Sequence, residues 1–491
     1  GSSLANNPRF PHAVILTCGT GNFDGTATTE TFVRLGTEAN PAGAVTAIGM
    51  ATSGTHTMFN NNLSSAIFKG IFANKMRSMG EALLYGRLFL NEVYAATHPN
   101  QASYFAHWCN LMGDPSMEVF VGIPEVITLT APASLPYGSL IVDAQTTDSS
   151  GNPIAGVCVT AYAASTDAVV AKAYSDEYGN VSLQIPSGIS EALLITASKN
   201  DHKPAQSTVL VAAGGLVANG ISLYDNGQHG STGDGDGIAR AGESVAVILN
   251  VRNTSDLTLS SLTGTVSSDD PHVNMESTAI SFADLAPYAT EDASVAVVVH
   301  IDHTIPNYHD VRLEVTVNDA DGNTHAFPVH IPAYNAMLSA VNLAISAGGN
   351  SILDPTETGS LTVTLKNEAF VPGYDLQAQL ISLNDLVVVN QANASVGTIA
   401  PNNLATLAEP FELFARSILI PGMQIPFKLR IYTTEGFEQF IPFNITIGNV
   451  TQNTPLGPDA YGYFIYDETD TAFMDCPQYE WIEINPTVGG S

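Results

Sequence analysis

One of the four cysteines stands where an apolar run meets a glycine-rich turn. Cys18 follows the run 13–17 (Ala-Val-Ile-Leu-Thr) and precedes Gly-Thr-Gly-Asn-Phe at 19–23. The end of a strand is rigid and a glycine-rich turn leaves the sulfur accessible, which are conditions that a nucleophilic thiol requires. A small cysteine beside an apolar run is also typical of a buried core residue. The run alone leaves both interpretations of Cys18 open.

The elements that must position this thiol are short strands and helices. The runs 13–17 and 44–50 are bounded by Gly, Pro and Asn, as buried parallel strands usually are. The segments 63–76 and 79–95 carry apolar residues at helical spacing. Alternating strands and helices predict an α/β sheet with its site at the carboxyl ends of the strands. The predicted helix faces are Leu63, Ile67, Ile71 and Phe72 in the first helix and Leu83, Leu84, Leu88 and Val93 in the second.

Five segments in a fixed order extend this pattern to residue 117. They read VILTCGTGNF (14–23), ETF (30–32), PAGAVTAIG (41–49), THTMFNN (55–61) and WCNLMGDPSM (108–117). Together they resemble the C-terminal part of the catalytic domain of gingipain-type cysteine peptidases, which have a caspase-like α/β fold. The resemblance covers residues 1–122 and implies that Cys18 is the nucleophile, with its own backbone N–H helping to hold the oxyanion. It also implies that Gly19, Thr55 and His56 line the pocket for a peptide or protein substrate.

The base that such a thiol needs is where the sequence departs from the family. In gingipain-type peptidases the catalytic histidine comes from a His-Gly segment upstream, whereas this sequence starts seventeen residues before Cys18. His12 lies at the opposite end of the same strand, and His56 is either a pocket residue or a solvated loop residue. Without a base, Cys18 would keep a pKa of about 8.5 and react slowly. We therefore expect a fragment, a processed chain completed by an N-terminal chain that supplies the histidine, or a non-catalytic relative.

Composition restricts the class of partner. Lys and Arg number 16 against 47 Asp and Glu, and this net charge of −31 disfavours nucleic acid and anionic lipid while favouring divalent cations. No apolar run approaches the length of about eighteen residues that spans a bilayer. The four cysteines form no CxxC pair and no dense scaffold, which excludes zinc and thioredoxin-like sites but leaves one disulfide open. Family and composition together imply an extracellular or cell-surface protein secreted by a bacterium.

Beyond residue 122 the pattern changes to short alternating runs separated by turns, which is typical of all-β sandwiches. Residues 123–215 resemble the immunoglobulin-like domain of gingipain relatives and carboxypeptidase-regulatory modules. Residues 216–335 and 336–449 form a tandem repeat that suits two seven-strand sandwiches. The predicted fold class is thus a partial α/β caspase-like domain followed by three all-β immunoglobulin-like sandwiches. Residues that recur 114 positions apart are Asp236 and Asn350, Glu243 and Glu357, Asn253 and Asn367, Pro287 and Pro401, and Pro328 and Pro442.

The segment 450–491 is rich in aromatic and acidic residues. Aromatic side chains at this density need burial against some partner. The segment is either a docking element for a neighbour or a glycan, or a connector that begins a further module.

The opening loop of the first repeat concentrates hard oxygen ligands. Carboxylates separated by glycines that permit sharp turns are what calcium coordination requires, although a metal-free Gly/Asp surface turn fits the same pattern. The second repeat has Gly348 in the place of Asp234, which predicts weaker calcium binding or none. The candidate ligands of a structural calcium ion are Asp225, Asp234, Asp236 and Glu243 in the first repeat and Asn350, Asp354 and Glu357 in the second.

Two functions fit these features. The first is a secreted gingipain-like cysteine endopeptidase that hydrolyses peptide bonds through Cys18. The second is a non-catalytic structural or adhesive surface protein, in which the α/β part is a remnant and the β modules form a calcium-stiffened stalk. An upstream His-Gly at a strand end favours the first function, and its absence favours the second.

Overall fold

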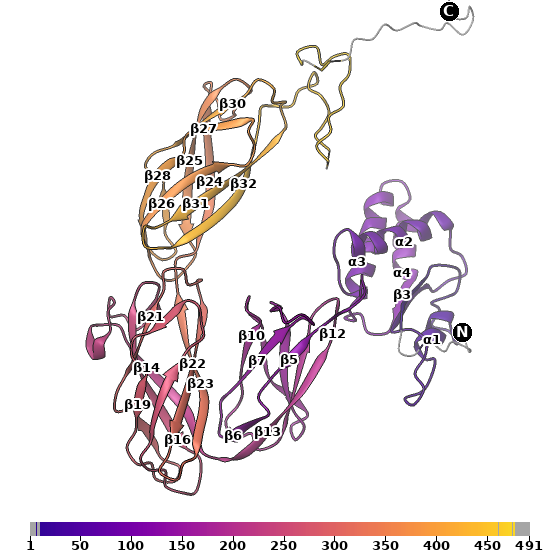
Figure 1. Cartoon of the computed structure of the whole chain (residues 1–491). Helices are drawn as coiled ribbons and strands as arrows, with labels where there is room; N and C mark the ends of the chain where they lie inside the picture. The colour runs from indigo at the N-terminus through magenta and orange to yellow at the C-terminus, as the bar shows by residue number, and fades with distance from the viewer. Residues whose placement is uncertain (1–5, 7–9, 460, 474, 477–491) are drawn as a thin grey trace, which may run out of the picture. The chain divides into compact units, whose positions relative to one another are not determined.

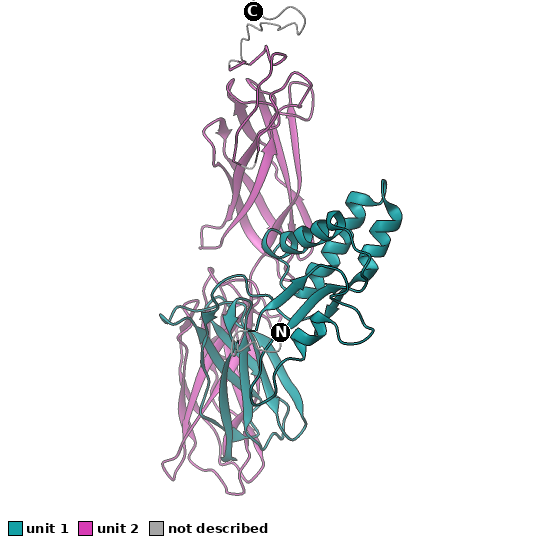
Figure 2. Ribbon diagram, turned by 90° about the vertical axis from the view of Figure 1, so that its right-hand side faces the viewer, with its two compact units in different colours: residues 1–213 teal, residues 214–491 magenta. Residues whose placement is uncertain are grey.

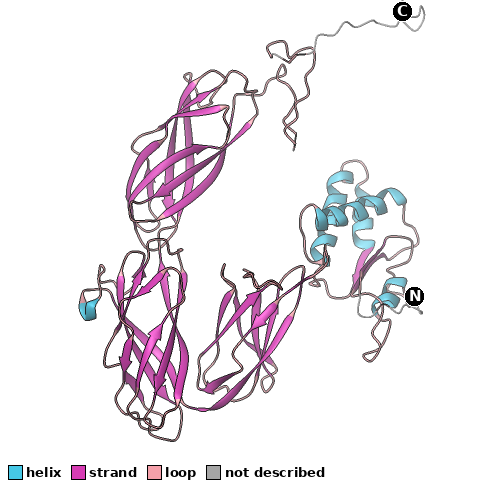
Figure 3. Cartoon of the chain, viewed as in Figure 1, coloured by secondary structure: helices cyan, strands magenta, loops and turns pink. Residues whose placement is uncertain are grey.

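The computed structural model describes residues 6, 10–459, 461–473, 475 and 476, so the end of the segment 450–491 lies outside the described residues. The chain divides into two compact units, 1–213 and 214–491 (Figure 2). The α-helices of the described residues all lie before residue 109, and strands dominate the rest of the described chain (Figure 3). Among the described helices, none is both long enough and apolar enough to cross a membrane.

The N-terminal part of the first unit is a three-stranded sheet with four helices (Figure 1). Its middle strand β2 (Thr46–Met50) pairs in parallel with β1 (His12–Ile15) and antiparallel with β3 (Cys109–Met112). Every residue of β2 is buried, whereas β1 is half-buried because it forms an edge of the described sheet. The first run is therefore less buried than its sequence predicts. The helices are α1 (Thr28–Val33), α2 (Thr57–Phe72), α3 (Met79–Tyr94) and α4 (Pro99–Trp108).

Helices α2 and α3 pack closely because a glycine lies between them. A Cβ atom at Gly86 of α3 would lie 2.9 Å from Cγ1 of Ile67 on α2, closer than side chains normally approach. α3 starts at a capping box, in which the Ser78 and Glu81 side chains each accept a backbone N–H of the other. The residues that α3 buries are Met79, Ala82, Leu83, Gly86 and Leu90.

The face predicted for the second helix is wrong, apart from Leu83. Leu84 and Leu88 are 55% and 61% exposed, and Val93 is exposed as well. Phe72, assigned to the buried face of the first helix, is 64% exposed. The prediction for α3 relied on large apolar residues. The buried side of α3 includes alanine and glycine, which add little to a hydrophobic pattern but allow the helices to pack closely.

The rest of the first unit is a β module built around a core of valine, leucine, isoleucine and alanine. One sheet has the order β10-β7-β5, a second the order β6-β13-β11-β8-β9, and the short strands β12 and β4 pair in parallel. The strands are β4 (Glu125–Val126), β5 (Thr128–Thr130), β6 (Ser134–Tyr137), β7 (Ile141–Thr147), β8 (Cys158–Ala163), β9 (Ala168–Tyr174), β10 (Asn180–Gln184), β11 (Leu193–Ser198), β12 (His202–Lys203) and β13 (Ala205–Gly214).

The first sandwich of the second unit packs two sheets over one apolar core. The sheets have the orders β14-β16-β21-β18, with β20 also on β16, and β15-β23-β22-β17-β19. A short 3₁₀ helix, Gln228–Gly230, lies in the loop before β15. The strands are β14 (Leu216–Tyr224), β15 (Ala239–Arg240), β16 (Ser244–Asn253), β17 (Thr263–Ser267), β18 (Val273–Met275), β19 (Ala279–Ser281), β20 (Thr290–Asp292), β21 (Val297–Ile301), β22 (His309–Asn318) and β23 (Thr324–Tyr334).

The second sandwich has the same plan around its own core. Its sheets are β24-β25-β30-β27, with β29 on β25, and β28-β26-β31-β32. The strands are β24 (Leu338–Ala347), β25 (Thr358–Asn367), β26 (Gly373–Ser382), β27 (Val387–Gln391), β28 (Asn393–Ile399), β29 (Leu404–Thr406), β30 (Phe411–Ala415), β31 (Gln424–Tyr432) and β32 (Glu438–Thr446).

Most equivalent strands of the two sandwiches start 114 or 115 residues apart, whereas the first strands are further apart. β16 and β25 start at residues 244 and 358, and β21 and β30 start at residues 297 and 411, both 114 residues apart. Strands β14 and β24 start 122 residues apart, at 216 and 338, and each carries a β-bulge after its third residue. The loop that follows the first strand is thus shorter in the second sandwich, and this loop holds the candidate calcium ligands.

A fully buried asparagine ends the central strand of each sandwich. Asn253 and Asn367 both have no exposed surface, and each side chain bonds the backbone of neighbouring loops. The Nδ2 atom of Asn253 donates to the carbonyls of Leu257, Leu285 and Ala286, and that of Asn367 donates to the carbonyls of Val371 and Ile399.

The aromatic residues of the C-terminal segment are not uniformly buried. Tyr461 and Tyr463 are 87% and 72% exposed. Asp459 Oδ1 accepts the backbone N–H groups of both residues, which fixes a tight turn, and Leu456 pairs with Ile465 across it. These two rings are exposed within the described residues, so their burial against a neighbour, a glycan or a further module stays a prediction.

We predict that Asn253→Ala destabilises its sandwich by at least about 2 kcal/mol, because several buried carbonyls lose their donor together. Scanning calorimetry of the full chain measures the effect as a lowered unfolding temperature. Asn274→Ala, at an exposed position of β18, is the matched control and should leave the transition unchanged. Equal transitions for the two variants would contradict the structural role of Asn253.

Candidate functional site

Cys18 lies on a turn that the buried hydroxyl of Thr20 ties to the sheet. Thr20 Oγ1 donates toward the carbonyls of Ile15 and Thr17, at 2.6 and 2.8 Å, and accepts the backbone N–H of Met50 at 3.2 Å. The turn that begins at the end of β1 is therefore fastened to the last residue of β2. Cys18 sits between these anchor points, at the carboxyl end of the two parallel strands, as the sequence predicts.

Glycines let this turn pass directly over the backbone of β2. A Cβ atom at Gly21 would lie 2.5 Å from the carbonyl carbon of Gly49, and one at Gly49 would lie 2.8 Å from the nitrogen of Gly21. Gly19 has φ +69°, a left-handed conformation that favours glycine, and its N–H donates to the carbonyl of Thr52 at 2.8 Å. The loops after both strands are thus joined around the cysteine by backbone contacts.

The thiol of Cys18 is exposed and has a hydrogen-bond partner on the neighbouring loop. Its Sγ lies 3.1 Å from Oγ1 of Thr55. The hydroxyl of Thr55, and next its backbone N–H, lower the pKa of Cys18 below the ordinary value, although desolvation opposes them. Cys109, by contrast, is buried at the start of β3, and burial raises its pKa to about 12. Of the two interpretations that the sequence left open, Cys18 is thus the exposed thiol, whereas Cys109 is a buried core residue.

Thr55 and His56, predicted to line the pocket, lie on the loop that leads into α2. His56 is the N-cap residue of α2, and its Nδ1 accepts the backbone N–H of Met58 at 3.2 Å. Its ring meets Phe59 edge-on, with 6.0 Å between the ring centroids. The structure therefore brings Thr55 to the sulfur, while His56 is exposed and caps a helix.

No histidine of the described residues is a hydrogen-bond partner of the Cys18 sulfur. His12 lies at the start of β1, where its ring bonds Thr46 Oγ1 at 2.8 Å and the carbonyl of Glu118 at 2.9 Å. It is held at the far end of the strand, in agreement with the sequence analysis. Within the described residues, Cys18 has a hydrogen-bonding partner but no general base.

Sequence reasoning missed Asn60 as a site residue. Asn60 is 7% exposed in the first turn of α2, and its Nδ2 donates to Thr55 Oγ1 at 3.2 Å. The residue belongs to the segment THTMFNN that contributes to the family resemblance, so its position was in view. Its contact with Thr55 depends on how the loop enters the helix, which residue types alone do not show.

Comparison with known proteins finds one family model that matches the N-terminal part of the chain. Residues 1–120 match the model of peptidase family C25. This part of the chain is similar to that family. No curated protein matches the chain.

Solved structures that match the chain include gingipain R (RgpB), an Arg-specific cysteine proteinase, at 18% identity and a TM-score of 0.35, covering 41% of this chain and 46% of that one. The complex of RgpB pro- and mature domains from Porphyromonas gingivalis matches at 16% identity and a TM-score of 0.33, covering 40% and 45%. Invasin, a bacterial integrin-binding protein, matches at 13% identity and a TM-score of 0.15, covering 66% and 60%. The chain spans about half the length of the gingipain structures that it matches.

The acidic loop of the first sandwich brings three of the predicted calcium ligands together. Carboxylate oxygens of Asp225, Asp234 and Asp236 lie within 4.8 Å of one another. Asp225 is 2% exposed, and its carboxylate accepts the backbone N–H groups of residues 235, 236 and 237 at 3.0–3.2 Å. The guanidinium of Arg240 forms ion pairs with Asp234 and Asp236. A calcium ion bound here would compete with this arginine for the two carboxylates.

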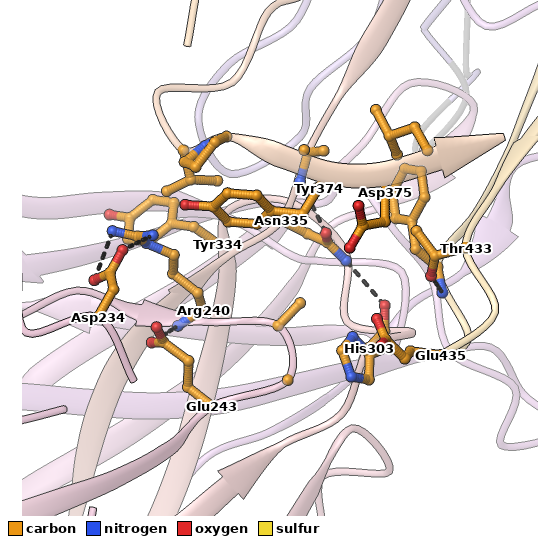
Figure 4. Close-up of a pocket in the computed structure, with 18 of the residues that line it drawn as sticks. Asp234, Arg240, Glu243, His303, Tyr334, Asn335, Tyr374, Asp375, Thr433 and Glu435 are labelled. Carbon is orange, nitrogen blue, oxygen red and sulfur yellow. Dashed lines mark hydrogen bonds and ion pairs between the residues drawn. The ribbon is translucent and has the colours of Figure 1, made fainter. Parts of the chain in front are cut away.

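Glu243 lies beside this group but is not one of the three clustered carboxylates. Burial raises its pKa to about 7, with Arg240 acting in the opposite direction. Glu243, Asp234 and Arg240 face a pocket of about 390 Å³ that Asp375 and Glu435 of the second sandwich also line (Figure 4). Asp234 and Arg240 point toward each other in this view, so the arginine already balances part of the acidic charge.

The predicted ligands of the second repeat do not gather in the same way. Among the described residues, the one acidic group with metal-ligand spacing is that of the first sandwich. Asp354 and Glu357 share a turn in which Glu357 Oε2 accepts the Asp354 N–H at 3.2 Å, and Asn350 Oδ1 accepts the N–H of Ile352 at 2.7 Å. A side chain at Gly348 would overlap the Glu357 carboxylate. The shorter loop has Gly348, which carries no carboxylate, 114 positions after Asp234.

We predict that Gly49→Ala disturbs the cysteine turn and lowers stability by about 1–3 kcal/mol, because its Cβ would strike the backbone of Gly21. Thermal unfolding and the rate of Cys18 alkylation, followed by peptide mass spectrometry, should both change. Gly54→Ala is the control, since its Cβ would meet no atom closer than 3.9 Å. A Gly49→Ala protein as stable and as reactive as the control would show that the close crossing is unimportant.

Calcium remains a prediction, and its test is the unfolding temperature with and without the ion. If the acidic loop binds calcium, adding the ion should raise the transition of the first sandwich and a chelator should reverse the change. Asp236→Asn should remove this response, whereas Asp256→Asn, at an exposed position of the same sandwich, should retain it. A transition that neither calcium nor chelator moves would rule out the site.

Proposed function

We propose that this chain is part of a secreted cysteine endopeptidase in which Cys18 is the nucleophile. The observation that carries the proposal is the exposed thiol of Cys18, placed on the turn after β1 and hydrogen-bonded to Thr55, within the segment that matches peptidase family C25. A strand end fixes the sulfur, and a lowered pKa increases the fraction of thiolate at neutral pH. Both properties are what covalent catalysis by cysteine requires.

In the proposed reaction the thiolate attacks the carbonyl carbon of a peptide bond, and the carbonyl π electrons move onto oxygen. Collapse of this intermediate expels the amine, which takes a proton from the conjugate acid of the base, and water then hydrolyses the thioester. The backbone N–H of Gly19 is engaged with Thr52, so the N–H of Cys18 is the amide that we assign to the oxyanion.

The described residues place no general base beside the sulfur of Cys18. We propose that a further polypeptide segment supplies a histidine, and that the complete site acts on peptide or protein substrates outside a bacterial cell. The acidic surface, with a net charge of −31, supports a role away from nucleic acids and anionic membranes.

A second candidate is a non-catalytic surface protein that uses the β modules as a scaffold. The observation in its favour is that no described histidine contacts Cys18, while the sandwich cores of the second unit are extensive and fully formed. In this case the α/β part would serve a structural purpose, and calcium at Asp225, Asp234 and Asp236 would stiffen the stalk.

We predict that a peptide carrying a thiol-reactive ketone at its C-terminus modifies Cys18 of the full chain at neutral pH, while Cys109 stays unmodified because it is buried. Mass spectrometry locates the label, and Cys18→Ala should abolish it. The same reactive group without its peptide provides the reference rate. A peptide probe that reacts no faster than this reference would favour the scaffold over the peptidase.

A further inference from the structure

The Cys18 sulfur is one end of a chain of hydrogen-bonding groups that continues into helix α2. Sγ of Cys18 lies 3.1 Å from Thr55 Oγ1, and Thr55 Oγ1 lies 3.2 Å from Nδ2 of Asn60. We propose that Asn60 orients the hydroxyl of Thr55 toward the sulfur, so that Thr55 and Asn60 are positioning residues that favour the thiolate of Cys18. This inference rests on the proposed role of Cys18 and adds two residues to its site.

The direction of the chain follows from the number of protons on each group. An amide nitrogen only donates, so Asn60 occupies a lone pair of Thr55 Oγ1. The hydroxyl of Thr55 has a single proton, which remains available for the sulfur. A thiolate can only accept a hydrogen bond, and it accepts the Thr55 proton more strongly than the sulfur of a neutral thiol, which is a weak acceptor. The arrangement therefore suits the ionised sulfur better than the neutral one.

The surroundings of Asn60 restrict the position of its side chain. Its side chain is 7% exposed, its backbone N–H donates to the carbonyl of His56 at 3.1 Å, and its neighbour Phe59 packs in the core of the domain. Its Oδ1 is buried without a partner among the described residues. A buried acceptor left unsatisfied costs about 1–3 kcal/mol. Turning the amide over would bring Oδ1 to the Thr55 hydroxyl and draw that proton away from the sulfur.

Hydrogen bonds, and not charged side chains, lower the pKa of the Cys18 thiol. The causes that lower the pKa of Cys18 are the side-chain and backbone bonds of Thr55 and the backbone of Cys18 itself, while desolvation raises it. No charged side chain is among these causes. His56, the nearest titratable neighbour in sequence to Thr55, uses Nδ1 to cap α2. The Thr55 hydroxyl is therefore the main local group whose removal should change the ionisation of Cys18.

The test is the rate of Cys18 alkylation by iodoacetamide as a function of pH, measured on the full chain by peptide mass spectrometry. Thr55→Val should move the midpoint of the profile upward by about 0.5–1 pH unit, which lowers the rate at pH 7 about three- to tenfold. Thr55→Ser should restore the profile because it keeps the hydroxyl. Asn60→Leu should shift the midpoint in the same direction by a smaller amount.

A matched control and a double variant separate the relay from loss of structure. Asn62→Leu alters a second amide of α2 whose Oδ1 is likewise buried without a partner but which does not bond Thr55. It should leave the midpoint unchanged. Because Asn60 acts through Thr55, the variant Thr55→Val/Asn60→Leu should show the midpoint of Thr55→Val alone.

Three results would overturn the inference: an unchanged midpoint in Thr55→Val, an Asn62→Leu shift equal to that of Asn60→Leu, or an Asn60→Leu effect that persists when Thr55 is valine. Iodoacetamide reports ionisation of the sulfur and needs no peptide recognition. A shifted profile together with failure of the peptide probe would thus reject the peptidase function and keep the relay. Peptide labelling with an unshifted profile would reject the relay and keep the function.

Discussion

A backbone crossing between the turn after β1 and the end of β2 determines where the Cys18 thiol lies. Gly21 and Gly49 approach so closely that neither position has room for a Cβ atom, and Thr20 fastens the same turn to Met50. A turn held in this way cannot move away from the sheet without breaking several buried contacts. The exposed sulfur is therefore presented by a rigid support, and the loop that carries Thr55 can meet it at a fixed distance.

Residue types and spacing identified Cys18, but not the contacts of Thr55 and Asn60 that surround its sulfur. A cysteine between an apolar run and glycines left an exposed thiol and a buried core residue both open, and the family resemblance favoured the exposed thiol that the structure has. Thr55 is 37 positions away along the chain, so its contact with the sulfur could be expected only from the family resemblance. Asn60 escaped notice because an asparagine in the first helical turn looks like an ordinary polar residue until its burial is known.

The same limit applies to the buried face of α3 and to the second acidic loop. Apolar periodicity locates large side chains, yet Ala82 and Gly86 are what allow α3 to pack against α2. The 114-residue spacing aligned Gly348 with Asp234, but could not show that the loop after the first strand is shorter in the second sandwich. In both places the deciding feature is seen only in the folded chain.

The strongly acidic character of the chain bears on how its thiol can ionise. A net charge of −31 creates a negative potential that disfavours a further anion, so a thiolate here needs stabilisation from groups close to it. A neutral hydroxyl and a backbone N–H in direct contact provide it over a short range, where salt screens little. A charged partner such as an imidazolium would add a stronger attraction, but none of the described histidines supplies it. Among the described residues the Thr55 contact is therefore the main interaction that lowers the pKa of Cys18.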